Sequence, residues 1–270
     1  MKPERKKIMD EVIKLKQQGL CNKEVGLITG VSSDCVWRWS RHLNLPYNHP
    51  LYKTSKIKHD YFSINNMKQY PDRFVLVGFI AADGCISTKN ETLCFNLCNK
   101  DRYVIDTLNN ILSNNTRTVT YIKSTNSCGI TFTSQEIATD LSRYGIIPRK
   151  TSTFQLPDLN STQMSYFLRG YLYGDGCCFD YGGNQFGYSY LCTSSMALAL
   201  RQYLITNKIM NHCIVSILKR NPIYSQVRFA GIRAIELSRY IFNNDDMILL
   251  PRKHIKYHVL KRDFIRRNLY

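Results

Sequence analysis

Two aspartates occupy the same position in a nine-residue stretch that the chain contains twice. Residues 76–84 read LVGFIAADG and residues 168–176 read LRGYLYGDG, so that Asp83 and Asp175 correspond. A carboxylate at a helix C-terminus faces the negative end of the helix macrodipole, and two carboxylates that lie close together repel each other. A divalent cation would relieve both effects, and hard cations such as Mg²⁺ prefer oxygen ligands. The repeated aspartates therefore predict a magnesium site.

Two helices with small faces would bring these carboxylates together. In each copy small residues recur four positions apart, on one face of a helix, and small faces allow two helices to pack closely. These residues are Gly78 with Ala82 and Gly170 with Gly174. We expect Gly84 and Gly176 to end the helices in the left-handed conformation, and the carbonyl oxygens of Ala82 and Gly174 are candidate further metal ligands. The alternative interpretation is two buried apolar helices that end in ordinary AspGly turns.

The composition indicates a basic, folded protein. The 270 residues include 37 Lys and Arg against 20 Asp and Glu, a net charge of +17 that predicts a polyanionic partner. No apolar run reaches the length of a membrane span and no signal peptide precedes the basic N-terminus, so we expect nucleic acid and no membrane as the partner. The ten cysteines include no CxxC pair, which disfavours a zinc ribbon. We expect free thiols in a reducing compartment, the cytoplasm or an organelle matrix.

The two nonapeptides resemble the signature of the LAGLIDADG homing endonucleases of the double-motif, single-chain kind. The matching residues are Leu76, Gly78, Ile80, Ala82, Asp83 and Gly84 in the first copy and Leu168, Gly170, Asp175 and Gly176 in the second. Both copies depart at the sixth position, where Ala81 and Tyr173 replace an aspartate, whereas the eighth position, the catalytic acid of the family, is intact twice. The resemblance implies an α+β fold of two tandem αββαββα repeats related by pseudo-twofold symmetry.

The resemblance also implies a function. It indicates a monomeric, site-specific double-strand DNA endonuclease that recognises a long site and hydrolyses both strands with Mg²⁺, or with Mn²⁺ in its place. The alternative is a DNA- or RNA-binding regulator or an intron maturase that keeps this fold without cleaving.

Four further residues are candidates for the catalytic centre. Phosphodiester hydrolysis needs a cation near the scissile phosphate, and Lys150 and Lys253 end the similar stretches IPRK and LPRK; a surface phosphate contact is the alternative for each. Family members hold water with a polar residue at the end of the second strand of each repeat. The residue at that position is Asn99 in the first repeat and Thr193 or Ser194 in the second. For both, the alternative is a polar residue that only caps the end of the strand.

The elements that must position these residues follow from periodicity. Period-two alternation after the first motif points Leu93, Phe95 and Leu97 to one face of a strand and Thr92, Cys94, Asn96 and Cys98 to the other, which is free to meet DNA. Helices are expected near 101–112, 134–144, 195–207 and 231–242, and strands near 118–124, 129–133, 186–193, 214–220 and 225–230.

The first 45 residues predict a separate helical domain. Three short helices broken near Gly19 and Gly30 resemble a helix-turn-helix whose third helix reads a major groove; a protein-binding module is the alternative. The expected domains are 1–45 (helix-turn-helix), 46–70 (basic linker), 71–157 (first repeat) and 158–270 (second repeat with a basic C-terminal helix).

Residues of three regions are expected to contact DNA. In the third helix of the N-terminal domain they are Ser33, Trp37, Arg38 and Arg41, and in the linker Lys53, Lys56 and Lys58. On the two sheets they are Tyr121, Lys123, Tyr188, Tyr190, Lys219, Gln226 and Arg228. The sequence leaves the register of the pleat open by one residue, which would place the neighbouring residues on the DNA-facing side instead.

Overall fold

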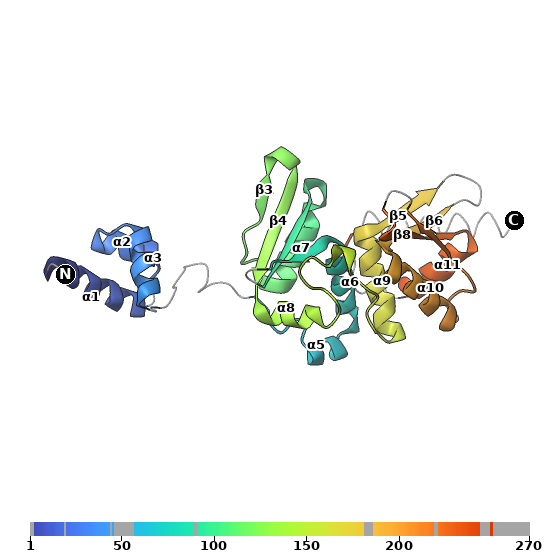
Figure 1. Cartoon of the computed structure of the whole chain (residues 1–270), viewed down its shortest axis with the longest axis horizontal. Coiled ribbons are helices and arrows are strands. Elements are labelled where there is room, and N and C mark those ends of the chain that lie inside the picture. Colours follow the sequence, from blue (N-terminus) through green and yellow to red (C-terminus); the bar gives the residue numbers. More distant parts are fainter. Residues whose placement is uncertain are drawn as a thin grey trace. The chain divides into compact units, whose positions relative to one another are not determined.

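The computed structural model describes residues 3–18, 20–43, 45, 57–88, 91–180, 186–218, 221–243 and 249–250. The chain divides into two compact units, residues 1–56 and 57–270, which we call the N-terminal unit and the core unit. Figure 1 shows the elements of each unit, and each is described here by itself. No helix among the described residues is long and apolar enough to cross a membrane.

The described residues of the N-terminal unit form three helices. They are α1 (Pro3–Gln17), α2 (Asn22–Thr29) and α3 (Ser33–His42). One valine from each helix forms the small core: Val12, Val25 and Val36. Side-chain caps define the starts of α2 and α3, where the Cys21 thiol accepts from the Glu24 amide and the Ser32 hydroxyl accepts from the Cys35 amide. The expected three-helix arrangement is therefore present.

The core unit consists of two repeats that share the order of their strands and main helices, and the first has an additional helix, α5, before them. The first contains α5 (Ile64–Gln69), α6 (Phe74–Asp83), β1 (Gly84–Ile86), β2 (Thr92–Cys98), α7 (Arg102–Ser113), β3 (Thr120–Ile122), β4 (Ser127–Thr133) and α8 (Gln135–Ser142), with short 3-10 helices η1 (Pro71–Arg73), η2 (Asn99–Asp101), η3 (Lys123–Thr125) and η4 (Lys150–Ser152). The second contains α9 (Ser161–Asp175), β5 (Gly176–Asp180), β6 (Phe186–Thr193), α10 (Ser194–Thr206), β7 (Ile214–Ile217), β8 (Tyr224–Ala230) and α11 (Ile232–Ile241). The two antiparallel sheets have the equivalent orders β1-β2-β4-β3 and β5-β6-β8-β7, which confirms the expected α+β repeats.

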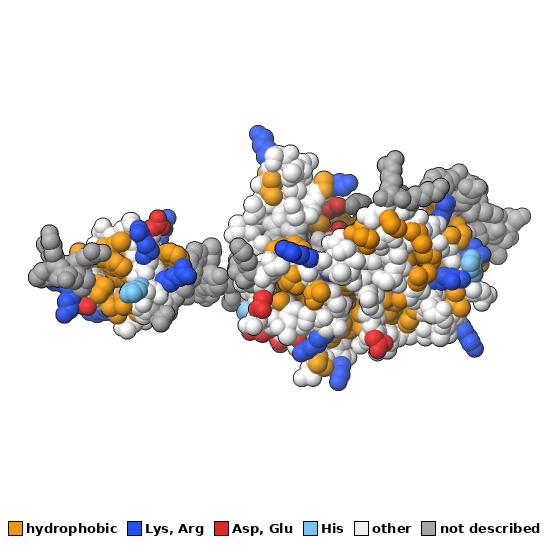
Figure 2. Space-filling model, viewed as in Figure 1, with side chains coloured by type: hydrophobic (Ala, Val, Ile, Leu, Met, Phe, Trp, Pro, Cys, Tyr) orange, Lys and Arg blue, Asp and Glu red, His pale blue; other side chains and the backbone are white. Residues whose placement is uncertain are grey.

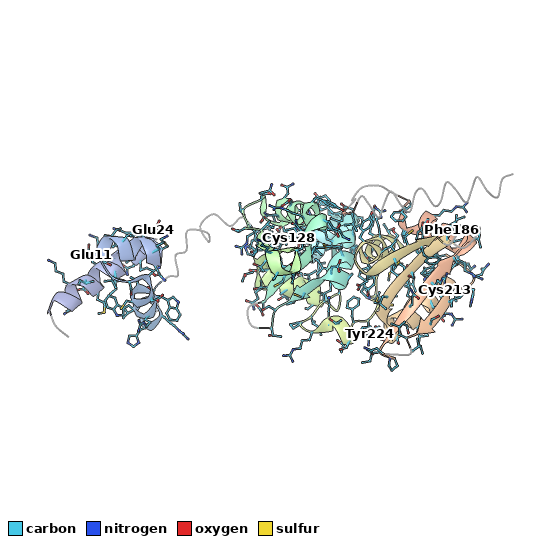
Figure 3. The ribbon with its side chains drawn as sticks, turned by 90° about the horizontal axis from the view of Figure 1, so that it is seen from above. Glu11, Glu24, Cys128, Phe186, Cys213 and Tyr224 are labelled. Atoms are coloured by element: carbon cyan, nitrogen blue, oxygen red, sulfur yellow. The ribbon has the colours of Figure 1, made fainter. Side chains whose placement is uncertain are left out.

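Helices α6 and α9 lie side by side in the middle of the core unit, with one sheet on either side (Figures 1 and 3). Small residues make this contact close. A Cβ atom at Gly78 would collide with the carbonyl oxygen of Phe167, and one at Gly170 would collide with that of Val75. The backbones therefore touch at these two positions, as the small helical faces predicted.

The prediction that Gly84 and Gly176 are left-handed helix stops is wrong. Their φ angles are −86° and −81°, and both residues are extended because each begins a strand, β1 or β5. Glycine is favoured there for space: a Cβ at Gly84 would lie 2.9 Å from the Ile80 carbonyl oxygen, and one at Gly176 would collide with that of Leu172. In each motif the helix ends at the aspartate, and the glycine that follows begins the strand at a point where a side chain would not fit.

The expected linker is shorter than residues 46–70. Tyr61, Phe62 and Met67 are buried in the main core, and α5 lies within the same stretch. The Lys58 amide donates to the carbonyl of Leu112 at 2.8 Å. Residues 57–70 thus belong to the core unit because they supply apolar side chains to its hydrophobic core.

Candidate functional site

The two aspartates lie at the same end of the α6–α9 pair. A Cβ atom at Gly174 would lie 3.1 Å from an Asp83 carboxylate oxygen, which places that carboxylate against the last turn of α9. Both carboxylates also act electrostatically on the same two groups, the Lys150 ammonium and the Tyr171 hydroxyl. The helix pair therefore brings Asp83 and Asp175 together in one polar cluster.

Two pockets flank the helix pair in equivalent positions. The Asp175 pocket, of about 220 Å³, is lined by residues that include Ala81, Ala82, Lys150, Tyr171, Asp175 and Thr193. The Asp83 pocket, of about 320 Å³, is lined by residues that include Phe79, Asp83, Asn96, Lys100, Tyr173 and Gly174. Each pocket thus takes its aspartate from one motif and the sixth and seventh residues from the other, as pseudo-twofold symmetry requires.

Lys150 is a buried cation beside the aspartates. Its side chain is 6% exposed, and its ammonium donates to the carbonyl of Gly84 at 2.8 Å. Burial lowers the pKa of Lys150, whereas Asp175, Cys85 and Asp83 raise it. A surface phosphate contact does not fit this burial, but the catalytic role of Lys150 stays a prediction. Lys253 lies outside the described residues.

Tyr171 is a site residue that the sequence reasoning missed. It lies in α9, four residues before Asp175, and lines the Asp175 pocket. Its hydroxyl donates to the carbonyl of Leu191 at 3.1 Å, and the Asp175 carboxylate is within hydrogen-bonding reach of the same hydroxyl. Burial raises the pKa of Tyr171, and the nearby carboxylates raise it further. The available signal was the i, i+4 spacing of Tyr171 and Asp175.

Thr193 lines the Asp175 pocket but is held by structural hydrogen bonds. Its hydroxyl donates to the Phe154 carbonyl at 2.6 Å and accepts from the Met196 amide at 3.2 Å, as the N-cap of α10. The geometry favours the capping interpretation, because the hydroxyl is used both as donor and as acceptor.

Asn99 directly follows the end of β2 but does not line the Asp83 pocket. Strand β2 ends at Cys98, and the Asn99 amide donates to the Asn126 carbonyl in the turn that follows. The strand registers pair Gly84 with Phe95 and Gly176 with Tyr190, so the equivalent of Asn99 is Ser194. Asn96 and Lys100 line the Asp83 pocket instead; the alternation of β2 already pointed Asn96 to the open face.

The donor set is compatible with magnesium. Mg²⁺ is commonly held by one or two carboxylates together with water and phosphate oxygens, and two carboxylates come together here. Ala82 and Gly174 stand in the last turns of α6 and α9, where carbonyl oxygens point out of the helix end. The described residues contain no group of three or more His, Cys, Asp and Glu that could hold a metal ion by themselves, so the remaining ligands would be carbonyl, water and phosphate oxygens.

The open sheet faces carry some of the residues expected to contact DNA. Tyr121, Lys123 and Gln226 are exposed, and the half-buried Arg228 stacks over the Phe179 ring at 4.3 Å. Tyr121 pairs with the buried Cys128, so Thr120 and Ile122 occupy the open face of β3. Lys219 lies outside the described residues.

The prediction for Tyr188 and Tyr190 is wrong. Both are buried, because β6 has the opposite pleat phase and directs them into the core. Their hydroxyls find partners there, Tyr190 on the Leu168 carbonyl at 3.1 Å and Tyr188 with Ser238 at 2.6 Å. Ser189 and Leu191 share the open face with Arg228 and Gln226, their partners in register.

The N-terminal unit presents the expected polar face. Ser33, Trp37, Arg38 and Arg41 are all exposed on α3, and the Arg41 guanidinium lies 5.5 Å from the Trp37 ring centroid. Lys and Arg side chains are spread over the face of this unit that Figure 2 draws. Lys53 and Lys56 lie outside the described residues, and the exposed Lys58 belongs to the core unit.

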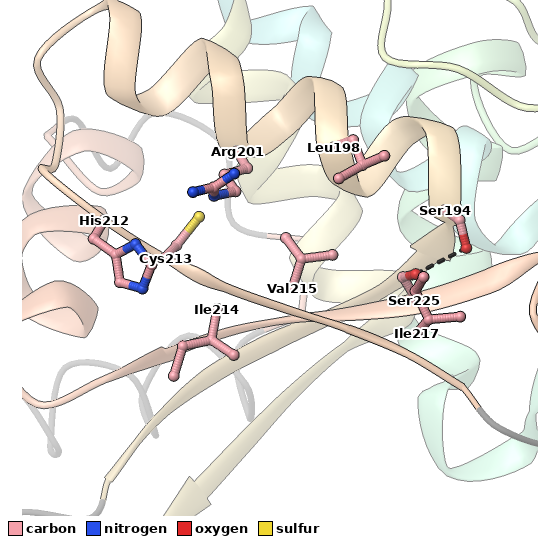
Figure 4. A pocket seen from close by; sticks show the side chains of 9 residues that line it. All are labelled: Ser194, Leu198, Arg201, His212, Cys213, Ile214, Val215, Ile217 and Ser225. Carbon is pink, nitrogen blue, oxygen red and sulfur yellow. Dashed lines mark hydrogen bonds between the residues drawn. The ribbon is translucent and has the colours of Figure 1, made fainter.

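A further groove lies away from the aspartates, between α10 and β7. It measures about 350 Å³, and Figure 4 shows Leu198, Val215 and Ile217 along it, with Arg201 and His212 toward one end. Hydrophobic side chains are exposed over the second repeat in Figure 2. None of the motif residues lines this groove, so it is not part of the candidate centre.

Known proteins were compared by sequence and by structure. No family model and no curated protein matches the sequence. The LAGLIDADG homing endonuclease I-GzeII, solved with its DNA target, is similar in structure: the match covers 72% of this chain and 91% of that chain at 11% identity, with a TM-score of 0.51. I-LtrWI, bound to target DNA, matches 74% of this chain and 91% of its own at 12% identity and a TM-score of 0.49. Full-length DUF199/WhiA from Thermatoga maritima matches 80% of this chain and 72% of its own at 18% identity and a TM-score of 0.43. The core unit thus has the fold of the LAGLIDADG homing endonucleases.

Proposed function

We propose that the protein is a site-specific endonuclease that hydrolyses both strands of double-stranded DNA at a long recognition site. The observation that supports this most strongly is the convergence of Asp83 and Asp175 at the ends of two helices in backbone contact, each beside its own pocket. Two equivalent carboxylates match a duplex, which has two equivalent scissile bonds. One chain carries both, so the proposed active form is a monomer.

The residues of the centre divide the work between binding and charge stabilisation. Asp83 and Asp175 would hold the metal, with the Ala82 and Gly174 carbonyls as further ligands. Mg²⁺, or Mn²⁺ in its place, would supply positive charge to the phosphate and a more acidic bound water. Lys150 holds a positive charge within the cluster, where burial keeps it from bulk screening.

The open faces of the two sheets bind the DNA on both sides of the cleavage site. Gln226, Arg228 and Lys123 provide donors for phosphates and base edges. The exposed side of α3 would enter a major groove as the third helix of a helix-turn-helix and lengthen the recognised site.

A second candidate is a regulator or intron maturase of the same fold that binds DNA or RNA without cleaving it. Tyr173 favours it: this bulky residue lines the Asp83 pocket, where its equivalent in the other pocket is the small Ala81. An aromatic ring at this position restricts the approach of a metal and a phosphate to Asp83.

Cleavage of DNA from the protein's own genomic locus in Mg²⁺ separates the two candidates. We expect Asp83→Asn and Asp175→Asn each to abolish cutting of at least one strand while DNA binding survives, because an amide cannot replace a carboxylate as a metal ligand. Asp158→Asn is the matched control, since Asp158 is exposed near the opposite end of α9. Full cleavage by the double variant Asp83→Asn/Asp175→Asn would overturn the assignment.

A further inference from the structure

We infer that Gln226 reads an adenine in the major groove of the bound DNA, and that Ser189 is the positioning residue that holds its amide. The inference rests on the proposed function, because it requires DNA on the open face of the second sheet. It names a base that the recognised site must contain, at a position in one half of that site.

The amide of Gln226 is held in one orientation. Its Nε2 donates to the Ser189 hydroxyl at 3.0 Å, from β8 to the neighbouring strand β6. Ser189 is a firm support, because it is 2% exposed and lies in the middle of β6. Among the described residues the exposed Gln226 side chain has no other hydrogen-bond partner. Its Oε1 atom and its second Nε2 hydrogen therefore remain available to a ligand on the open face.

This pair of groups matches one base edge. A phosphate offers acceptors alone, so it would leave the Oε1 atom facing another acceptor. In the major groove guanine offers two acceptors, cytosine a donor, and thymine an acceptor beside its methyl group. Adenine offers the N6 donor next to the N7 acceptor, and a glutamine amide bonds to both at once. Adenine is therefore the base that satisfies both available groups of Gln226.

The place of Gln226 in the sheet also suits the major groove. This groove admits a two-stranded β-ribbon, and β8 forms such a ribbon with the edge strand β7. Ser216 lies directly opposite Gln226 on β7 and is small and exposed, so it leaves space beside the amide. Arg228, two residues further on, is directed over the Phe179 ring at 4.3 Å. A side chain that is ordered in this way before binding loses less conformational entropy when it binds.

The first sheet has no side chain at the position equivalent to Gln226. The strand registers make Asn96 of β2 and Leu191 of β6 equivalent. Their partners in register are Gly129 and Gln226, respectively. Because glycine cannot read a base edge, the adenine that Gln226 reads has no counterpart at the equivalent place in the other half of the DNA. The recognised site is therefore not a palindrome.

The test compares the DNA sequences that the full-length protein and its variants select from a randomised duplex library, without divalent metal so that no DNA is cut. We expect Gln226→Ala to lose the preference for adenine at one position, by roughly 5- to 150-fold, the discrimination typical of a bidentate base contact. Gln226→Glu should select cytosine at that position, because a carboxylate accepts from the cytosine N4 amino group. A variant that fails to fold cannot acquire such a new preference.

Two further variants test the support and the charge. Ser189→Ala removes the hydroxyl and should weaken the adenine preference at the same position alone, whereas a merely structural loss would weaken the preferences at all positions. Gln202→Glu is the matched control. Gln202 is exposed on α10, and its amide also donates to a hydroxyl, that of Thr206 at 2.9 Å. The same change of charge there, away from the open face, should leave the selected sequence unchanged.

The outcomes separate the inference from the proposed function. If the wild type selects a sequence but does not cut it in Mg²⁺, the nuclease assignment fails and the Gln226 variants still decide the inference. If Gln226→Ala lowers the affinity for all duplexes equally, Gln226 is a phosphate contact and the inference is overturned. A Gln226→Glu variant that keeps the wild-type preference, or an affected base other than adenine, overturns it as well. A wild type that selects no sequence overturns both.

Discussion

The surroundings of the Lys150 side chain support a catalytic role for this residue. A lysine loses its hydration when it is buried, and such a residue is retained where its charge has a partner. Here the ammonium has the Gly84 carbonyl as acceptor and both aspartates near it. The cost of keeping this charge in the interior is consistent with a role at a phosphate whose negative charge grows during hydrolysis.

We expect Lys150→Met to lower the cleavage rate at saturating protein on the order of 100-fold, the loss typical of one preorganised electrostatic interaction. DNA affinity should change little, because an interaction that strengthens only in the transition state contributes little to ground-state binding. Lys123→Met is the comparison, since Lys123 is exposed and a phosphate contact there affects affinity alone. If Lys150→Met also loses affinity without losing cleavage rate, as expected for Lys123→Met, Lys150 is a phosphate contact and not a catalytic residue.

The pH dependence follows from the same burial. Because the pKa of Lys150 is lowered, its charge is lost at a lower pH than that of a free lysine. The cleavage rate of the wild type should therefore fall as pH rises through this lowered pKa. Lys150→Arg should lack this alkaline limb, since a guanidinium stays charged. An alkaline limb that is equal in the two proteins would assign it to another group.

At the scale of elements, the contact between α6 and α9 holds the centre together. Adding a methyl group at Gly170 drives it into the Val75 carbonyl oxygen, which belongs to a helix backbone and cannot step aside. We expect Gly170→Ala to lower the free energy of unfolding by roughly 1 to 3 kcal/mol or more. Gly129→Ala is the milder comparison, because its Cβ would lie 3.0 Å from the Phe95 carbonyl oxygen. Denaturant unfolding measures both, and equal midpoints would contradict the backbone contact.

A separate prediction concerns the register of strands β1 and β2. Cys85 and Cys94 lie opposite each other on β1 and β2, and burial, with Cys85 as a neighbour, raises the pKa of Cys94 to about 11. Opposed residues of an antiparallel pair have Cα atoms about 4.5 to 5.5 Å apart, within the range that a disulfide spans. A thiol oxidant should link the two, as peptide mass spectrometry would show. Cys177 faces Ser189 and should gain such a partner only in Ser189→Cys; absence of the first link under conditions that form the second would contradict the register of β1.

The order of elements could be predicted from the sequence because helical and alternating periodicities extend over many residues. The pleat phase of β6 could not be predicted, because Tyr188 and Tyr190 are amphipathic and are compatible with either face of a sheet. Their burial depends on partners for their hydroxyls that only the structure shows. The glycines after each aspartate were assigned to the wrong conformation, because a steric need and a left-handed φ both select glycine.

The residues of the candidate centre also divide into those that the sequence predicted and those that it did not. Asp83 and Asp175 were found from a repeated motif, and Lys150 from a repeated tetrapeptide. Tyr171 and Lys100 were not, because each has its place only through tertiary contacts, Tyr171 between α9 and β6 and Lys100 beside the end of α6. The sequence therefore predicted candidate residues that recur in both motifs and missed candidates that do not recur.

At the scale of the whole molecule, the two units divide the chain at residue 56, upstream of both motifs. The N-terminal unit has a core of three valines and exposes Arg38 and Arg41 on α3. A partner that binds only the folded form of such a small unit would stabilise it. Two covalently joined DNA-binding units would gain affinity from each other through effective concentration.

Removing residues 1–45 should therefore leave cleavage chemistry intact and weaken binding. The protected DNA should shorten at one end, and the salt dependence should flatten by roughly 0.9 in the log–log slope for each phosphate that the truncated protein no longer neutralises. Arg38→Ala and Arg41→Ala should reproduce part of this effect, whereas Lys7→Ala on α1 is the control for a cation outside the groove-facing helix. Footprinting and binding at several salt concentrations measure the affinity, the protected length and the slope. An unchanged footprint with an unchanged slope would mean that α3 contacts a partner other than DNA, because a helix in a major groove cannot be removed without exposing the bases and phosphates that it covers.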